Sequence, residues 1–156
     1  GKHSIHHVNY ELSSRVIMKS GNITLRQGID YKVTYKNNKN VGNGKIIITG
    51  LKAYKADYVI DLKIRTAKPT VKVKRVGKKK VKVNVSKKIK GATGYEVSYS
   101  KKSNFKKKFT KVKNVKKLKF TFKRANKKQK YYVRVRSYKK VGKKYYYSKY
   151  TKKVRI

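Results

Sequence analysis

The sequence predicts an all-β fold, organised as two tandem antiparallel β-sandwich domains. Apolar and polar residues alternate with period two along most of the chain, which is the pattern of half-buried strands. No segment of useful length carries apolar residues at helical spacing. The alternating segments are short and are separated by turns rich in Gly, Asn and Lys, as in antiparallel sandwiches.

The first half of the chain contains three predicted strands. The clearest carries Tyr31, Val33 and Tyr35 at every second position, and looser alternation covers 45–49 and 58–64. Turns are predicted at 37–40 and 42–44, because Asn and Gly tolerate the left-handed backbone that tight turns require.

The second half repeats the strand pattern more regularly. In six segments the apolar residues mark one face, and lysines and arginines occupy the alternate positions. The apolar sets are Val71/Val73, Val81/Val83/Val85, Tyr95/Val97/Tyr99, Leu118/Phe120/Phe122, Tyr131/Val133/Val135 and Tyr145/Tyr147. We therefore expect Tyr131, Val133 and Val135 to be buried, while Tyr132, Arg134 and Arg136 face outward.

The charge divides the chain at the same place as the composition. The 156 residues contain 48 Lys+Arg and 5 Asp+Glu, a net charge of +43. Residues 1–67 hold 12 basic and 4 acidic residues (net +8), whereas residues 68–156 hold 36 basic residues and only Glu96 (net +35). The single proline, Pro69, lies in a short polar segment between the two halves, which favours a domain boundary there. We predict domains at 1–67 and 68–156.

The composition argues against an enzyme. The only carboxylates are Glu11, Asp30, Asp57, Asp61 and Glu96, and there is no cysteine. Catalytic and metal sites draw on clusters of carboxylates, histidines or thiolates, so we expect neither enzymatic activity nor a cofactor. No apolar run approaches the ~20 residues of a membrane span, so no membrane insertion is predicted. No secretory hydrophobic segment is present, and we expect the chain to be part of a longer protein.

Two groups of residues could be considered for metal binding. His3, His6 and His7 lie at one end of the chain without neighbouring acids, so a solvent-exposed segment is the favoured interpretation. Asp57 and Asp61 would share one face of a strand; relief of repulsion among lysines is favoured there over calcium binding. No metal site is predicted.

The second half resembles a bacterial fibronectin type III domain. The matching segments are 91–100 (Gly-Ala-Thr-Gly-Tyr-Glu-Val-Ser-Tyr-Ser), 131–138 (Tyr-Tyr-Val-Arg-Val-Arg-Ser-Tyr) and 147–150 (Tyr-Ser-Lys-Tyr). The resemblance implies that Tyr131 is the residue of the tyrosine corner. The sequence departs from the family in having no Trp near Val85 or Ser86, and in having Ala125 where Leu is usual. Both departures imply a differently filled core.

The first half resembles a bacterial immunoglobulin-like repeat. The matching residues are Leu25, Gly28, Asp30-Tyr31, Val33, Tyr35, Asn37-Asn38, Asn40-Val41-Gly42, Ile48, Gly50 and Tyr54. Domains of both kinds occur in surface and secreted proteins of Gram-positive anaerobes. The resemblance implies a non-catalytic modular protein at the bacterial cell surface or in the cell wall, but it implies no particular ligand.

The excess of lysine suggests what the second domain binds. Basic clusters fall mostly at predicted turns, and further basic residues occupy outward strand positions such as Lys72 and Lys74. The candidate polyanion-binding residues are Lys78, Lys79, Lys80, Lys106, Lys107, Lys108, Lys127, Lys128, Arg134, Arg136, Lys143 and Lys144. An AT-rich genome explains the choice of Lys over Arg, but it does not explain the near-absence of acids. Because self-repulsion at +43 lowers stability, an anionic environment is a reasonable inference.

The expected partners are anionic polymers: teichoic acid and other wall polymers, glycans, or extracellular DNA. Lysine binds phosphate or sulfate without bidentate geometry, so the attraction would be broad and salt-dependent. Tyr132, Tyr138 and Tyr146 are expected to face outward, where they either stack on sugars or bases or cover sheet faces or the domain interface. The module is expected to be monomeric within its longer chain. Two alternatives remain: an accessory module of a secreted polysaccharide-degrading enzyme, and a nucleic-acid-binding protein that lacks recognisable motifs.

Overall fold

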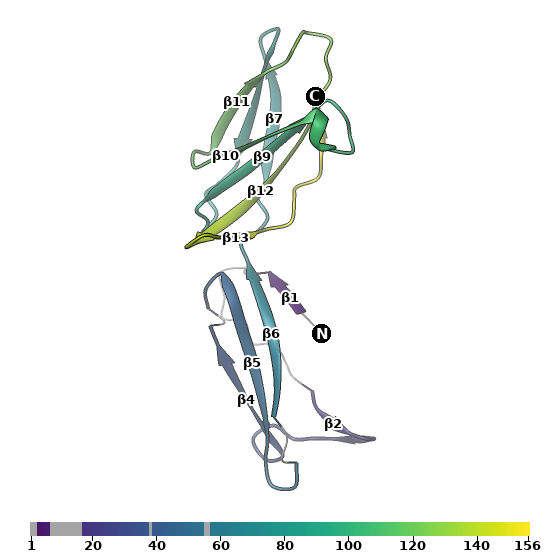
Figure 1. The fold of residues 1–156 in the computed structure, drawn as a ribbon, viewed down its shortest axis with the longest axis vertical. Coiled ribbons are helices and arrows are strands. Elements are labelled where there is room, and N and C mark those ends of the chain that lie inside the picture. Colours follow the sequence, from purple (N-terminus) through teal and green to yellow (C-terminus); the bar gives the residue numbers. More distant parts are fainter. Residues whose placement is uncertain (1–2, 7–16, 38, 55–56) are drawn as a thin grey trace. The chain divides into compact units, whose positions relative to one another are not determined.

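The all-β prediction is confirmed by the structure, a computed structural model that describes residues 3–6, 17–37, 39–54 and 57–156 (Figure 1). In the described part of the chain the one helical element is the short 3₁₀ helix η1 (Lys107–Phe109). The chain divides into two compact units, Gly1–Arg65 and Thr66–Ile156. The division lies two residues before the boundary that the sequence suggested at 67/68. No helix within the described ranges is long and apolar enough to cross a membrane.

The first unit is built around a four-stranded sheet with the order β1-β6-β5-β4. Its strands are β1 (His3–His6), β4 (Tyr31–Lys36), β5 (Gly42–Gly50) and β6 (Asp57–Arg65). A small hairpin pairs β2 (Lys19–Ser20) with β3 (Ile23–Thr24). Strands β4, β5 and β6 are antiparallel and contain the three segments that the alternation predicted. In contrast, β1 runs parallel to β6, which their wide separation in the sequence permits, since parallel strands need a long connection.

Period-two burial defines the core of the first unit. In β5, Ile46 and Ile48 are buried while Lys45 is exposed. Residues 42–44 belong to this strand, so the turn predicted there was wrong. These two residues pack with Leu25, Tyr31 and Leu62. The core is small, which matches the thin apolar content of this half of the sequence.

The second unit consists of two antiparallel sheets. One has the order β11-β8-β7, and the other the order β10-β9-β12-β13, with β14 also paired to β12. The strands of the first sheet are β7 (Val71–Val76), β8 (Lys80–Val85) and β11 (Lys119–Lys123). Those of the second are β9 (Gly94–Ser100), β10 (Thr110–Val115), β12 (Tyr132–Val141), β13 (Lys144–Tyr147) and β14 (Val154–Arg155). This is the sandwich arrangement that the fibronectin type III resemblance implies.

The inner faces of both sheets supply one core. Tyr131, Val133 and Val135 are buried as predicted, and they pack with inward residues of β8 and β9. An aromatic cluster completes this core: the rings of Tyr99 and Phe122 stack with centroids 4.1 Å apart, and Tyr131 meets Phe122 edge-on at 5.4 Å. Three smaller rings thus contribute the aromatic bulk of a core that has no Trp.

The segment between β13 and β14 is not a strand, but it still forms hydrogen bonds with the backbone of β12. Ser148 Oγ accepts a bond from the Ser137 amide (3.0 Å), and Thr151 Oγ1 accepts one from the Val135 amide (3.0 Å). In return, the amides of Ser148 and Thr151 donate to the carbonyls of Ser137 and Val135. Two hydroxyls therefore replace backbone carbonyls as acceptors, and the segment between them carries Tyr150 to the outer face of the sheet.

Candidate functional site

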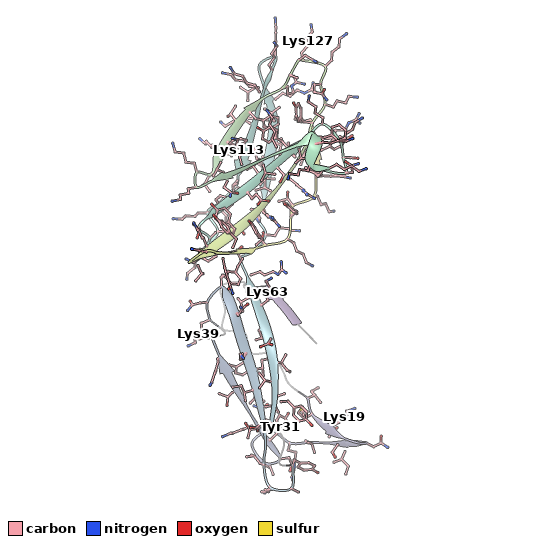
Figure 2. All side chains as sticks on the ribbon, viewed as in Figure 1. Lys19, Tyr31, Lys39, Lys63, Lys113 and Lys127 are labelled. Carbon is pink, nitrogen blue, oxygen red and sulfur yellow. The ribbon has the colours of Figure 1, made fainter. Side chains whose placement is uncertain are left out.

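All ten lysines among the predicted binding residues are exposed in the structure. Eight of them belong to residues 77–80, 101–109 and 124–130, which we call the basic end of the second unit. The strand register brings these three segments to one end of the sandwich. Lys80 pairs with Lys123, which places the turn 77–79 beside the loop 124–130. Ser100 pairs with Tyr132, which places the loop after β9 at the same end. Lys127 extends from this end in Figure 2.

Arg124 connects two segments of the basic end from beneath, and sequence reasoning missed it. Its side chain is 4% exposed and has no carboxylate partner. Instead, its guanidinium donates to the carbonyls of Lys127 (2.8 Å) and Lys78 (2.6 Å), while its backbone amide donates to the Lys79 carbonyl (2.7 Å). Because these acceptors are backbone carbonyls, no carboxylate lies beside the guanidinium beneath the lysines. Arg124 continues the inward parity of Phe120 and Phe122, but a charged residue next to a turn was not expected to be buried.

The loop 101–109 presents its lysines around an aromatic anchor. The ammonium groups of Lys102 and Lys108 lie 5.9 and 5.0 Å from the centroid of the Phe109 ring. Phe105 adopts a positive φ of 52°, an unusual conformation for a bulky residue, and its ring contacts Arg134. The loop is thus fixed by aromatic contacts while Lys106, Lys107 and Lys108 remain exposed.

Lys143 and Lys144 lie apart from the other predicted lysines. They belong to the hairpin that joins β12 to β13, in which Val141 pairs with Lys144. The start of β12 lies at the basic end and this hairpin follows its last residue, so it lies at the other end of the sandwich. The structure therefore places the predicted binding residues in at least two separate regions.

Arg134 and Arg136 lie on the outer face as predicted, but both are half-buried between aromatic rings. The Arg134 guanidinium lies 4.1 Å from the Phe105 centroid and 3.9 Å from that of Tyr150. Arg136 lies 3.6 Å from Tyr147 and 4.5 Å from Tyr150. Together these five side chains, which we call the outer stack, alternate aromatic rings with guanidinium groups along β12.

Glu96 holds the outer stack from the neighbouring strand. Arg136 donates to both carboxylate oxygens, Nε to Oε1 at 2.9 Å and Nη2 to Oε2 at 3.2 Å, and the Tyr150 hydroxyl donates to Oε1 at 2.7 Å. Burial raises the pKa of Tyr150 above its ordinary value of 10.0, and the hydrogen bond to Glu96 raises it further. The carboxylate therefore neutralises Arg136 inside the stack, and this arginine is poorly placed to bind an external anion.

Tyr138 and Tyr146 were expected at outward positions, either as a stacking platform or as cover for a sheet face or the domain interface, and both are buried. Tyr138 is 5% exposed because Tyr145 and Tyr147 pack against it, with ring centroids at 5.3 and 6.2 Å. Tyr146 is 8% exposed, and Tyr132 is half-buried. Tyr138 also covers Gly94, where a Cβ atom would lie 2.8 Å from its hydroxyl oxygen and 2.7 Å from the Val115 carbonyl oxygen. These rings cover the sheet instead of offering a platform for sugars.

Two described acidic residues of the first unit have basic partners. Asp61 forms an exposed ion pair with Lys45 (3.7 Å), which agrees with the interpretation that it relieves repulsion among lysines. Asp30 accepts a bond from the Arg26 amide, which lowers the pKa of its carboxyl group. The described residues contain no group of three His, Cys, Asp or Glu side chains that could hold a metal ion. His7 and the side chains of His3 and His6 lie outside the part that can be described.

The first unit has a partly apolar hollow of about 290 Å³ beside the β2–β3 hairpin. Its walls include Leu25, Tyr31, Tyr54 and Tyr58, and Tyr31 and Lys19 mark the region in Figure 2. This hollow was not predictable from the sequence, because its walls come from segments that are not adjacent in the chain.

Comparison with known proteins gives structural similarity only. No protein-family model matches the sequence, and the search of curated proteins gave no match. The structure is similar to the FN1–FN3 domains of chicken CNTN1, with a TM-score of 0.49 and 14% identity over 75% of this chain. It is also similar to domains of titin, with a TM-score of 0.40 and 14% identity over 88% of this chain. The matches span 43% and 52% of those two chains, respectively.

Proposed function

We propose that the second unit binds anionic polymers through its exposed lysines, as a non-catalytic binding or spacer module of a bacterial surface or secreted protein. One observation carries this proposal. The only acidic side chain in residues 66–156 is Glu96, and Arg136 and Tyr150 occupy its oxygens. The exposed lysines of this unit therefore have no side-chain carboxylate within the unit to balance them. An external polyanion would supply the missing charge.

The chemistry of lysine sets the expected mode of binding. An ammonium group is a hydrated point charge that can donate hydrogen bonds to phosphate or sulfate from many directions. Binding should therefore depend on the charge density of the polymer and not on a particular sugar or base. Release of counterions from the polymer would drive association and make it strongly dependent on salt. Wall polymers such as teichoic acid, anionic glycans and extracellular DNA all meet this requirement.

Retention of the intact chain on immobilised heparin at increasing salt tests the proposal. We expect strong retention at low salt and a steep linear fall of log affinity with log salt concentration. Two matched variants each remove three exposed charges. One replaces Lys106, Lys107 and Lys108 by Gln, and the other replaces Lys19, Lys32 and Lys63 of the first unit.

The first variant should be eluted at clearly lower salt than the intact protein, and the second should elute close to it. Equal shifts would mean that only net charge matters. Retention that does not respond to salt would contradict the proposal, since a specific uncharged site would then be responsible.

A further inference from the structure

The outer surface of the three-stranded sheet carries a regular array of lysines. Val81, Val83 and Phe122 point into the core from β8 and β11, so the residues that alternate with them point away from it. On the three strands these outward positions include six lysines, which we call the lysine face: Lys72, Lys74, Lys80, Lys82, Lys119 and Lys123. Lys82 on the central strand is half-buried and the other five are exposed.

The strand register sets lysines of this face directly opposite each other. Lys74 on β7 pairs with Lys82 on β8, and Lys80 on β8 pairs with Lys123 on β11. Directly opposed side chains have Cβ atoms about 5 Å apart, and like charges at that separation destabilise a sheet. The three strands contain no acidic residue that could relieve the repulsion. The opposed ammonium groups therefore repel each other in the free protein. An anion bound between two opposed lysines would turn this repulsion into attraction.

The lysine face can hold a single chain of phosphates. Same-face positions lie about 6.7 Å apart along a strand, and neighbouring strands lie about 4.8 Å apart. Two opposed lysines can thus reach the same phosphate, and a chain that continues along the strands meets further lysines of the face. In a double helix the phosphates are divided between two strands across grooves about 6 and 12 Å wide, so only one of the two strands can lie along the opposed lysines.

The chemistry of the face also argues against ligands that need stacking. Its other outward positions within the paired register include Asn84, which lies between Lys72 and Lys119, and Thr121, which lies opposite Lys82. Neither offers an aromatic ring, whereas proteins that bind single-stranded nucleic acids stack the bases on such rings. The face therefore recognises charge and hydrogen-bond acceptors alone.

We propose that the lysine face is the docking surface for a single, unbranched, phosphate-linked polymer chain, whose phosphates lie between opposed lysines of adjacent strands. This inference rests on the proposed function and assigns its polyanion a surface and a chemical class. Lys80 and Lys123 adjoin the turn 77–79 and the loop 124–130, so a longer chain continues from the face over the basic end.

Binding of long-chain inorganic polyphosphate to the intact 156-residue protein tests the inference. One variant replaces Lys74, Lys80, Lys82 and Lys123 by Gln. The control replaces four exposed lysines that lie outside the face by Gln: Lys87, Lys88, Lys143 and Lys144. It therefore removes the same number of positive charges as the face variant. Because every replaced residue is at least partly exposed, both variants should fold. Affinity is measured at several salt concentrations, together with the melting temperature with and without polyphosphate.

We expect the face variant to bind polyphosphate at least tenfold more weakly than the control. Its slope of log affinity against log salt should fall by roughly three, since each lost phosphate contact removes about 0.7. Polyphosphate should raise the melting temperature of the control more than that of the face variant. Duplex DNA or anionic vesicles of phosphatidylglycerol should bind the intact protein more weakly than polyphosphate at equal phosphate concentration.

The outcomes separate this inference from the proposed function. If the intact protein binds no polyanion at low salt, the proposed function fails. If it binds polyphosphate but the two variants weaken equally, the proposed function stands and the lysine face is not the docking surface. Tighter binding of duplex DNA or of vesicles overturns the assignment of a single phosphate chain.

Discussion

Replacement of Glu96 by Gln is the most direct test of how the second unit tolerates its charge. The side chain of Glu96 is 8% exposed and that of Arg136 is 25% exposed. The substitution keeps the size of the side chain but removes the carboxylate to which Arg136 and Tyr150 donate three hydrogen bonds. The guanidinium then stays between two tyrosine rings without a counter-charge.

The expected loss of stability is about 2–4 kcal/mol. Removal of one partner of a fully buried ion pair costs about 3–5 kcal/mol. Arg136 retains partial access to solvent, which lowers that figure, and its contacts with Tyr147 and Tyr150 remain favourable for a cation. The loss should exceed that of an ordinary surface substitution by a wide margin.

Asp61→Asn is the matched control. It also removes one negative charge from the chain, so the general rise in self-repulsion is the same, but its ion pair with Lys45 is exposed and contributes at most about 1 kcal/mol. Urea unfolding, which leaves ionic strength unchanged, would be followed by NMR signals assigned to each unit. Similar losses for the two variants would refute the view that Glu96 organises the outer stack.

Three further predictions concern the same unit. Val133→Ala or Val135→Ala should destabilise it by about 1–3 kcal/mol in urea unfolding, because both side chains are completely buried. Gly94→Ala should cost about 1–3 kcal/mol, since a Cβ atom would press on the Val115 carbonyl and on Tyr138; an unchanged midpoint would mean that the ring moves freely. Tyr150→Phe should cost about 1.5–3 kcal/mol near neutral pH through the lost bond to Glu96. Burial raises the pKa of Tyr150 in the folded state, so its contribution is complete below the unfolded pKa of about 10 and declines above it. The stability difference between the intact protein and Tyr150→Phe should therefore shrink as pH rises past 10, and a difference that grows there would contradict this sign.

The period-two pattern was sufficient to predict strand parity where a strand crosses the middle of the sandwich. Tyr131, Val133 and Val135 are buried because consecutive side chains of a strand must point to opposite faces. The exposure of turn lysines was predictable for a similar reason, since a lysine at a turn has no apolar surface to cover. Both results depend only on local order along the chain.

The surroundings of the outward residues were not predictable from local order. Alternation correctly placed Arg134 on the outer face, and on that basis Arg134→Ala would be an ordinary surface change below about 1 kcal/mol. The rings that enclose it belong to Phe105 and Tyr150, which lie in loops distant in the sequence. The burial of Tyr138 was not predictable for the same reason, because the rings that pack against it, Tyr145 and Tyr147, lie across the hairpin. The opposed lysines of the lysine face likewise depend on which strands pair, and alternation alone does not give this.

The surroundings of the positive charges differ between the two outer surfaces of the sandwich. On the five-stranded sheet, the outward arginines are enclosed by aromatic rings, and the one carboxylate of the unit neutralises Arg136. On the three-stranded sheet, opposed lysines have neither rings nor acids beside them. The unit has one carboxylate, and its position beside Arg136 leaves the opposed lysines of the other surface without a counter-charge. If the proposed docking surface is correct, an external anion would gain most at the lysine face, where each bound phosphate would remove a repulsion between opposed lysines.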